Sequence, residues 1–207
     1  MEAEVTFKKS PMVDPLDLSP FFDKHPLLET ERLLLRPITL DDKEAIYSFY
    51  SDPEIMKYRV SPLHRSIEDT VRFLETDFIS FTERKRIRFG IELKARGALI
   101  GTGGFHHIDP EHHRLEMGYS LRREFWGYGY MTETVKELIR FAFEEMGIHR
   151  VAAMCDVDND RSARVMERCG MTLEGTFRDY ELWRGKFVTL RMYAILKQPP
   201  PPDPLLW

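Results

Sequence analysis

Residues 126–131 read Trp-Gly-Tyr-Gly-Tyr-Met and join a predicted strand, Arg114–Leu121, to a predicted helix, Tyr130–Met146. Two glycines separated by one residue let the backbone turn tightly and approach a ligand without a Cβ in the way. The first N–H groups of the helix have no partner within it and point into the same space. This arrangement favours an anion, and a pyrophosphate fits it best.

The loop does not match two common nucleotide-binding motifs. A dinucleotide fingerprint needs a third small residue three positions after Gly129, where this chain has Thr132, and a Walker loop needs a Gly-Lys-Ser/Thr sequence that this chain lacks. Dinucleotides and nucleoside triphosphates are therefore disfavoured. Because such a loop can also be a plain turn, the motif alone leaves both interpretations open.

Hydrophobic periodicity on both sides of the loop predicts about seven strands and about four helices. The strands are expected at Arg32–Ile38, Ile87–Leu93, Ala98–His106, Arg114–Leu121, Arg150–Val157, Met171–Tyr180 and Lys186–Leu196. The helices are expected from the Thr39–Asp42 capping box to Tyr50, at Ser66–Ile79 with Phe78 on its apolar side, at Tyr130–Met146 and at about Asn159–Cys169. A helix between Arg114–Leu121 and Arg150–Val157 implies a parallel, right-handed crossover, so the fold class is α/β with a mixed sheet.

The composition is that of an ordinary globular chain. It has 207 residues, a formal net charge of −4, 43% hydrophobic residues and 31% charged residues. These values exclude a disordered, collagen-like or supercharged chain and favour one domain with one core. The net negative charge disfavours nucleic acid and anionic lipid as partners.

The two ends are rich in proline. Residues 1–26 show no periodicity and are interpreted as an N-terminal arm, whereas 198–207 (QPPPPDPLLW) favour polyproline II and form a Pro-rich tail. No apolar stretch is long enough for a membrane span or a signal peptide, so the cytoplasm is the expected compartment. Cys155 and Cys169 are expected to be buried and reduced, because two cysteines make no disulfide framework.

Several further motifs follow one another in a set order. They are Thr30-Glu31-Arg32-Leu33, Leu35-Arg36-Pro37, Ser51-Asp52-Pro53-Glu54, Leu99-Ile100-Gly101, Glu116-Met117-Gly118-Tyr119, Phe125–Glu133, Asn159 with Ser162, Glu167-Arg168-Cys169-Gly170 and Leu173-Glu174-Gly175. With them, the chain resembles the GNAT superfamily of acetyl-CoA-dependent N-acetyltransferases, and more narrowly its Rim-type ribosomal-protein N-terminal acetyltransferases. The resemblance implies a single GNAT-type α/β (α+β) domain over 27–197. Its sheet would be mixed and mostly antiparallel, with a splayed parallel central pair.

The resemblance also implies how the cosubstrate acetyl-CoA binds. The loop would hold the pyrophosphate, the pantetheine arm would enter the gap between the parallel strands, and a backbone N–H near Tyr119 would hold the developing oxyanion. Gly118 is expected at a bulge that opens this gap. The residues expected to bind acetyl-CoA are Tyr119, Ser120, Leu121, Trp126, Gly127, Tyr128, Gly129, Tyr130, Met131, Thr132, Asn159, Ser162, Ala163 and Met166.

Two departures from the family pattern bear on the mechanism. A frequent Gln or Arg before the loop is Glu124 here, although Arg122 and Arg123 could supply charge toward the phosphates. The Tyr that many members use as general acid, four residues before the glycine ending the short helix, is Met166. Protonation of the leaving thiolate therefore needs another group.

Acetyl transfer to an amine needs a neutral nucleophile and a proton for the thiolate. Glu116, on a strand beside the proposed thioester site, is the candidate base, and a solvated strand carboxylate is the alternative. Ser162 is the candidate acid, and a helix-capping role is its alternative. His106, His107, His112 and His113 lie near Asp109 and Glu111, but no zinc spacing matches, so no metal is expected. His107 could help to relay a proton.

The expected reaction is direct acetyl transfer from acetyl-CoA to a primary amine in a ternary complex. A protein N-terminal α-amino group is the preferred acceptor, and a small-molecule amine, including an antibiotic, is the alternative. A non-catalytic acyl-CoA-binding or interaction module is an alternative of another class, motivated by Met166. The chain is expected to be a monomer or a homodimer.

Overall fold

Eight strands form one sheet in the computed structural model, which describes residues 14–59 and 61–198. In chain order they are β1 (Leu28–Glu29), β2 (Leu33–Pro37), β3 (Ile87–Leu93), β4 (Ala98–Asp109), β5 (Arg114–Leu121), β6 (Arg150–Asp156), β7 (Thr172–Trp183) and β8 (Lys186–Leu196). Their spatial order is β1-β2-β3-β4-β5-β6-β8-β7, with every neighbouring pair antiparallel except β5 and β6. The mixed, mostly antiparallel sheet expected from the sequence is confirmed.

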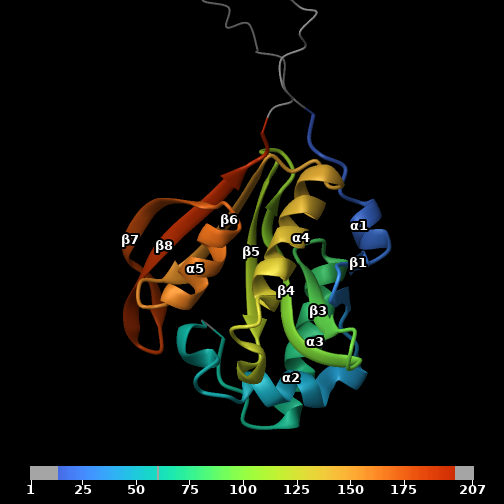
Figure 1. The fold of residues 1–207 in the computed structure, drawn as a ribbon, viewed down its shortest axis with the longest axis vertical. Coiled ribbons are helices and arrows are strands. Elements are labelled where there is room, and N and C mark those ends of the chain that lie inside the picture. Colours follow the sequence, from blue (N-terminus) through green and yellow to red (C-terminus); the bar gives the residue numbers. More distant parts are fainter. Residues whose placement is uncertain (1–13, 60, 199–207) are drawn as a thin grey trace, which may run out of the picture.

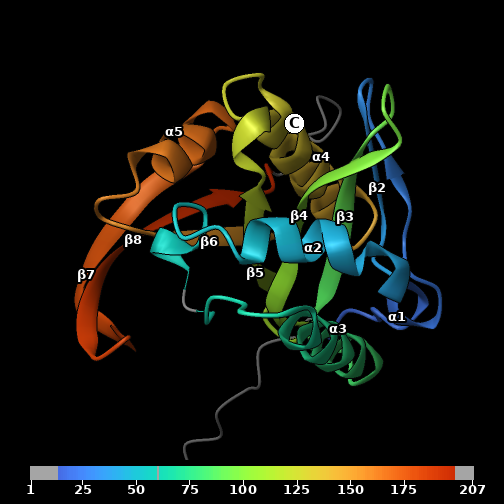
Figure 2. The same cartoon turned by 90° about the horizontal axis from the view of Figure 1, so that it is seen from below.

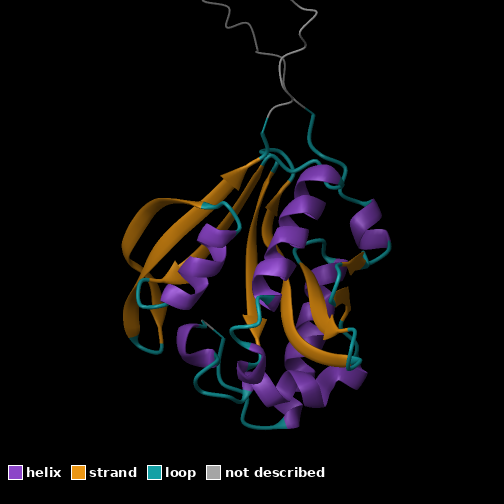
Figure 3. Cartoon of the chain, viewed as in Figure 1, coloured by secondary structure: helices purple, strands orange, loops and turns teal. Residues whose placement is uncertain are grey.

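Helices cover both faces of this sheet (Figures 1 and 2). They are α1 (Pro20–Asp23), α2 (Lys43–Tyr50), α3 (Ile67–Thr82), α4 (Tyr130–Glu144) and α5 (Asp160–Arg168), with short 3-10 turns η1 (Leu40–Asp42), η2 (Met56–Tyr58) and η3 (Arg123–Phe125). Helices α4 and α5 lie on one face, and α2 and α3 lie on the other, as Figure 3 also shows. The two faces therefore have separate cores, the larger one under α4.

The parallel pair at the centre of the sheet opens along its length. Strands β5 and β6 pair only from Arg114↔Arg150 to Glu116↔Ala152, although both strands continue for several residues. The rest of β5 keeps its pairing with β4 on the other side, from Glu116 to Leu121. The splayed parallel pair expected from the resemblance is thus present in the structure.

The bulge expected at Gly118 is not there. The β4–β5 register runs without a break from Gly101↔Leu121 to His106↔Glu116, and the irregularity falls between His106 and Asp109. His107, with φ of 45°, occupies the left-handed region at this point. The strands splay because β6 diverges after Ala152, so no extra residue in β5 is needed to open the gap.

The buried face of α3 also differs from the expectation. Phe78 is 37% exposed, whereas Thr70, Leu74 and Asp77 are the buried residues of this helix. Asp77 tolerates burial because it accepts a 2.8 Å hydrogen bond from Arg88 Nε. A polar partner on a distant strand, which periodicity does not reveal, therefore allows Asp77 to be buried beside the predicted core residue Leu74.

Part of the predicted N-terminal arm packs on the domain. Leu18 is 5% exposed, and the ring of Phe21 meets that of Phe141 on α4 edge to face at 5.4 Å. Strand β1 and helix α1 are the two elements that the sequence pattern did not predict. The tail predicted at 198–207 lies outside the described residues except for residue 198.

Candidate active site

Two glycines shape the loop that begins α4. Gly127 and Gly129 have φ of 87° and 81°, a left-handed conformation that strains residues with a Cβ. Gly129 is the N-cap of α4, so the N–H groups of Tyr130, Met131 and Thr132 have no acceptor within the helix. The loop therefore presents unbonded N–H groups at the positive end of a helix dipole, as the sequence predicted.

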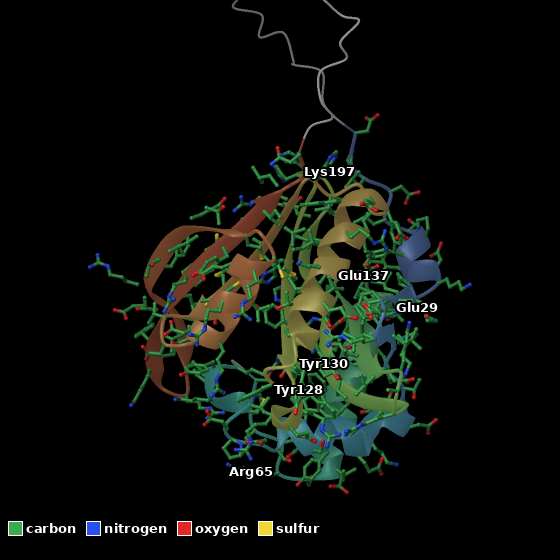
Figure 4. All side chains as sticks on the ribbon, in the orientation of Figure 1. Glu29, Arg65, Tyr128, Tyr130, Glu137 and Lys197 are labelled. Atoms are coloured by element: carbon green, nitrogen blue, oxygen red, sulfur yellow. The ribbon has the colours of Figure 1, made fainter. Side chains whose placement is uncertain are left out.

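An ion pair with the turn between β1 and β2 fixes the orientation of this loop. The carboxylate of Glu133 accepts hydrogen bonds from Thr30 Oγ1 and Arg32 Nε, both at 2.6 Å. Burial alone would raise the pKa of Glu133, but these hydrogen bonds outweigh it and lower the pKa. Arg32 also donates to the carbonyl of Tyr128 at 3.0 Å and lies over the ring of Tyr130, at the start of α4 in Figure 4.

The outer hollow beside this loop has a volume of about 440 Å³, and two cationic side chains line it together with the carboxylates of Glu31 and Glu133. Lys136 and Arg168 line it together with Gly129 and Thr132. From the sequence, Arg122 and Arg123 were the residues that could supply charge toward the phosphates. The structure pairs those two residues with Glu124 and Asp52, and neither lines this hollow.

A larger cavity of about 1180 Å³ extends through the gap between β5 and β6. On the α4 and α5 side it begins at the loop and passes Ser162. On the α2 and α3 side it reaches Arg59, Arg88 and His106. One continuous space therefore connects the anion-binding loop to the opposite face of the sheet.

Most of the residues expected to bind acetyl-CoA line this cavity. They are Tyr119, Ser120, Leu121, Trp126, Gly127, Gly129, Tyr130, Met131, Thr132, Asn159 and Ser162. Tyr128, Ala163, Met166 and Glu116 are not among its lining residues. Tyr128 is 64% exposed at the rim, whereas Ala163 and Met166 are buried in the core beneath α5.

Two hydroxyl groups meet where the cavity passes α5. Tyr119 Oη lies 3.0 Å from Ser162 Oγ and donates to the Ser162 carbonyl at 3.2 Å. Burial raises the pKa of Tyr119 well above its usual range although the bond to Ser162 opposes this, so the phenol stays protonated. Asn159 caps α5 by accepting from the Ser162 N–H at 3.2 Å, which places Ser162 in the first helical turn. Tyr119 on β5 thus brings a hydroxyl group close to α5, the helix in which Met166 stands where many family members have a tyrosine.

The end of β5 is held by an indole. Trp126 Nε1 donates to the carbonyl of Leu121 at 2.8 Å, and the guanidinium of Arg161 lies 4.4 Å from the Trp126 ring. The Leu121 carbonyl is therefore already bonded, whereas the Tyr119 carbonyl receives only a long 3.4 Å contact from Arg59. A pantetheine amide entering the gap would pair most readily near Tyr119.

The bulge in β4 brings the imidazole rings of His106 and His107 close together. Neighbouring strand residues normally point to opposite faces, but the left-handed backbone at His107 leaves its ring 4.9 Å from that of His106. His107 Nδ1 lies 3.3 Å from a carboxylate oxygen of Glu116. Burial lowers the pKa of His106 to about 4, so this ring is neutral at pH 7, and its Nδ1 has no partner among the described residues.

His106, His107 and Glu116 are the described residues whose ligating atoms lie close enough to hold a metal ion, within 4.8 Å of one another. That no metal binds, as expected from the sequence, stays a prediction. Arg59, Arg86 and Arg88 were not expected at the site, because Arg59 belongs to no motif and the other two lie in a basic run, Arg84–Arg88, that carries no functional pattern. Only the fold gathers them on one wall of the cavity.

Among the residues that the structure describes, no helix is long and apolar enough to cross a membrane. The loop, the gap and the paired hydroxyls fit an acyl-CoA: the helix N-terminus suits its phosphates, and the splayed strands leave room for an extended arm. Both requirements are met by the same cavity.

Comparison with known proteins agrees with this geometry. Residues 32–172 match the family model described as the acetyltransferase (GNAT) domain. The chain is 35% identical over 172 residues to the uncharacterized N-acetyltransferase YoaA of Bacillus subtilis (strain 168), covering 83% of this chain and 97% of YoaA. It is 37% identical over 102 residues to the putative ribosomal N-acetyltransferase YdaF of the same strain, covering 49% of this chain and 56% of YdaF.

A solved structure shows the same fold. The microcin C7 self-immunity acetyltransferase MccE, crystallised with acetyl-CoA and AMP, superposes with a TM-score of 0.74 and 27% identity, covering 81% of this chain and 94% of MccE. The chain therefore belongs to the GNAT family of acetyltransferases and is an acetyl-CoA-dependent N-acetyltransferase.

Proposed function

We propose that this enzyme acetylates a protein N-terminal α-amino group, in the manner of the Rim-type ribosomal-protein acetyltransferases, and that it acts in the cytoplasm. The observation that carries the proposal is a group of exposed apolar side chains on the β7–β8 hairpin, which also contributes one residue to the cavity lining. Glu181 of β7 lines the cavity, and its neighbours Tyr180 and Leu182 are 49% and 62% exposed. Phe187 on β8, which pairs with Leu182, is 65% exposed.

Exposed apolar side chains in such a group are typical of surfaces that bind another protein. A peptide whose first residue enters the cavity would continue over this hairpin, whereas a small amine would not need it. The similarity to YdaF, whose name includes a ribosomal acetyltransferase activity, supports the same choice. Family membership favours an enzyme over a non-catalytic acyl-CoA-binding module.

The proposed chemistry also suits an α-amino group. Its reference pKa is about 8, against about 10.4 for lysine, so little base assistance is needed to obtain the neutral amine at pH 7. We assign Glu116 as the base that receives the amine proton, with His107 at 3.3 Å as the group that can relay the proton from the amine to it. Because Glu116 does not itself line the cavity, transfer through His107 or a water molecule fits better than direct contact.

On the other face of the sheet, Ser162 is the proposed donor of the proton that the leaving thiolate takes up. Tyr119 Oη, 3.0 Å from Ser162 Oγ, can return a proton to Ser162. The base and the acid thus approach the reacting bond from opposite faces of the sheet, which the gap between β5 and β6 makes possible.

A small-molecule amine is the second candidate acceptor. It is favoured by the similarity to MccE, a self-immunity acetyltransferase whose crystals contain a nucleotide as well as acetyl-CoA.

The deciding experiment is a thiol-release assay with acetyl-CoA and two panels of acceptors, N-terminal peptides and small amines. A kcat/KM for at least one peptide that is tenfold above every small amine would support the proposal. A small amine that exceeds all peptides would replace it with the second candidate. Each peptide is assayed once with a free α-amino group and once with this group blocked. Activity that is lost on blocking is N-terminal acetylation, and activity that remains is lysine acetylation.

A further inference from the structure

We propose that the acceptor end of the cavity is a carboxylate-recognition site, so that the preferred acceptors are peptides with an acidic side chain among their first three residues. This inference rests on the proposed function and narrows its substrate class. It is argued from the arginines on the α2 and α3 side of the sheet.

Two glycines form the floor of this part of the cavity. In the sheet register, Arg88 of β3 lies opposite Gly104 of β4, which lies opposite Gly118 of β5. A Cβ built on Gly118 would have only His106 Nε2 within 4 Å, at 3.6 Å. The sheet surface is therefore hollow at Gly118, whereas a Cβ on Gly104 would clash with the Ile87 carbonyl oxygen of β3.

Three arginines share this part of the cavity with a single paired carboxylate. Arg59 and Arg88 donate to the hydroxyl of the buried Tyr50 at 3.1 Å and 3.0 Å. Arg88 Nε donates to Asp77 at 2.8 Å, and Arg86 NH1 lies 3.5 Å from the same carboxylate oxygen. Asp77 is the only carboxylate that pairs with these three guanidiniums among the described residues.

The cluster therefore carries an excess of positive charge in a place partly shielded from water. The side chains of Asp77 and Arg88 are 10% and 12% exposed, and that of Arg86 is 36% exposed. Burial, together with the neighbouring Arg88, lowers the pKa of Arg86. Charges that share one counterion at low exposure repel each other, and an anionic ligand would relieve this repulsion.

A donor without an acceptor points to the same conclusion. Arg59 Nε is fully buried and has no hydrogen-bond partner among the described residues, and Arg59 lines the cavity. Buried N–H groups are nearly always satisfied in native proteins, so the unpaired Nε shows that the internal contacts of Arg59 do not use every donor of its guanidinium. A carboxylate matches the flat, forked guanidinium better than a neutral group does.

The spacing fits an acidic side chain near the N-terminus. Glu116 lies on β5 and Arg88 on β3, two strands apart, which corresponds to about 10 Å across a sheet. An amine held near Glu116 would place the side chain of the second or third residue of an extended peptide within reach of Arg86 and Arg88. Glu54 and Glu181 also line the cavity, but neither pairs with these arginines among the described residues.

The test uses two matched peptides, Ser-Glu-Ala-Ala-Trp and Ser-Gln-Ala-Ala-Trp, which differ only in charge. Wild type is expected to acetylate the acidic peptide with a kcat/KM about ten- to a hundredfold higher, the range of one or two charge-assisted hydrogen bonds. Arg86→Gln should reduce this ratio to below threefold. Arg72→Gln, which removes an exposed arginine of α3 outside the cavity, should leave the ratio unchanged.

Binding provides a readout that does not need turnover. Calorimetric titration of each peptide into the enzyme with coenzyme A should show the same preference and the same loss in Arg86→Gln. Arg59→Gln serves as a second variant if Arg86→Gln unfolds at a lower temperature than wild type. Free glutamate and glutamine share the α-carboxylate and differ only in the side chain, so assaying them side by side shows whether a side-chain carboxylate suffices on a small amine.

The outcomes separate the two proposals. Equal kcat/KM and equal affinity for both peptides, or a preference that survives in Arg86→Gln and Arg59→Gln, would overturn the carboxylate site while leaving N-terminal acetylation intact. Tighter binding of the acidic peptide without any acetylation would sustain the carboxylate site and overturn the proposed function. If neither peptide binds, the carboxylate site for peptides is refuted.

Discussion

Replacement of Ser162 by alanine should slow acetyl transfer about a hundredfold and leave the affinity for acetyl-CoA within about threefold. General acid catalysis contributes about 10²- to 10⁴-fold, so a hundredfold loss is the low end for removal of a proton donor. It corresponds to about 2.7 kcal/mol of transition-state stabilisation. Affinity changes little because the loop at Gly127 and Gly129, which is proposed to hold the phosphates, makes no hydrogen bond to Ser162 Oγ among the described residues.

The contact with Tyr119 makes this prediction sharper. Tyr119 Oη lies 3.0 Å from Ser162 Oγ, so the two hydroxyls should act as one unit. Tyr119→Phe should lower kcat by about three- to tenfold, because Ser162 then loses the group that returns its proton. In the Ser162→Ala background, the same change should have almost no further effect on kcat. A purely structural role for Tyr119 would instead give additive losses.

The assay measures kcat by thiol release and the dissociation constant of acetyl-CoA by calorimetry for wild type, both single variants and the double variant. Thermal unfolding is recorded for all four, because loss of one buried hydrogen bond costs about 1 kcal/mol. Ser162→Thr keeps a hydroxyl and serves as the matched control, with most of the activity expected to remain. A kcat for Ser162→Ala within twofold of wild type would remove Ser162 from the mechanism and return it to the capping role.

Other perturbations test the two faces of the sheet separately. Gly118→Ala should raise KM for the acceptor severalfold without changing the free energy of unfolding by more than about 0.5 kcal/mol, because its Cβ meets only His106 Nε2 at 3.6 Å; a KM equal to that of wild type would show that this hollow is not used. Gly101→Ala should cost more than about 2 kcal/mol in denaturant unfolding, since its Cβ would lie 2.4 Å from the Ser120 carbonyl oxygen; a smaller cost would mean that β4 and β5 can separate. Burial lowers the pKa of His106 from 6.5 to about 4 in the folded state. Between these two pH values, His106 therefore takes up a proton in the unfolded state and stays neutral in the folded state. Stability is therefore retained above pH 6.5 and falls as pH drops from 6.5 to 4, by up to about 1.4 kcal/mol per pH unit; His106→Gln should flatten this slope, and an unchanged slope would refute the assignment. Turnover should be the same before and after dialysis against EDTA, and a loss that Zn²⁺ restores would contradict the expectation of no metal.

The sequence predicted best the elements whose signal is local. The bounds of β5 are those expected, and α4 begins at Tyr130 as predicted, because a strand, a glycine loop and a helix with regular apolar spacing follow each other. The end of α4 was two residues off: it lies at Glu144, not Met146, although Met146 is buried as expected. Of the fourteen residues expected to bind acetyl-CoA, eleven line the cavity.

The remaining features depend on partners far apart in the chain. Asp77 and Thr70 are buried on α3 because Arg88 and His64 provide hydrogen bonds, of 2.8 Å and 2.9 Å, and no pattern within α3 indicates this. Helix α1 was assigned to an arm because its four residues are too few to show a period. The turn at His107 was missed because an isolated histidine with positive φ has no sequence signature.

The same reasoning explains why the acceptor end was harder to predict than the acetyl-CoA end. The proposed phosphate site at the acetyl-CoA end is one continuous loop, whose glycines and backbone N–H groups would hold the phosphates, so its geometry is encoded within a few residues. The acceptor end is built from β3, β4, β5 and the chain around η2, which are distant from one another in the sequence. Its specificity therefore depends on cross-strand register: a one-residue slip of β3 would move Arg88 to the other face of the sheet. Substitutions at the acceptor end can thus change the preferred amine while leaving the loop, and with it acetyl-CoA binding, intact.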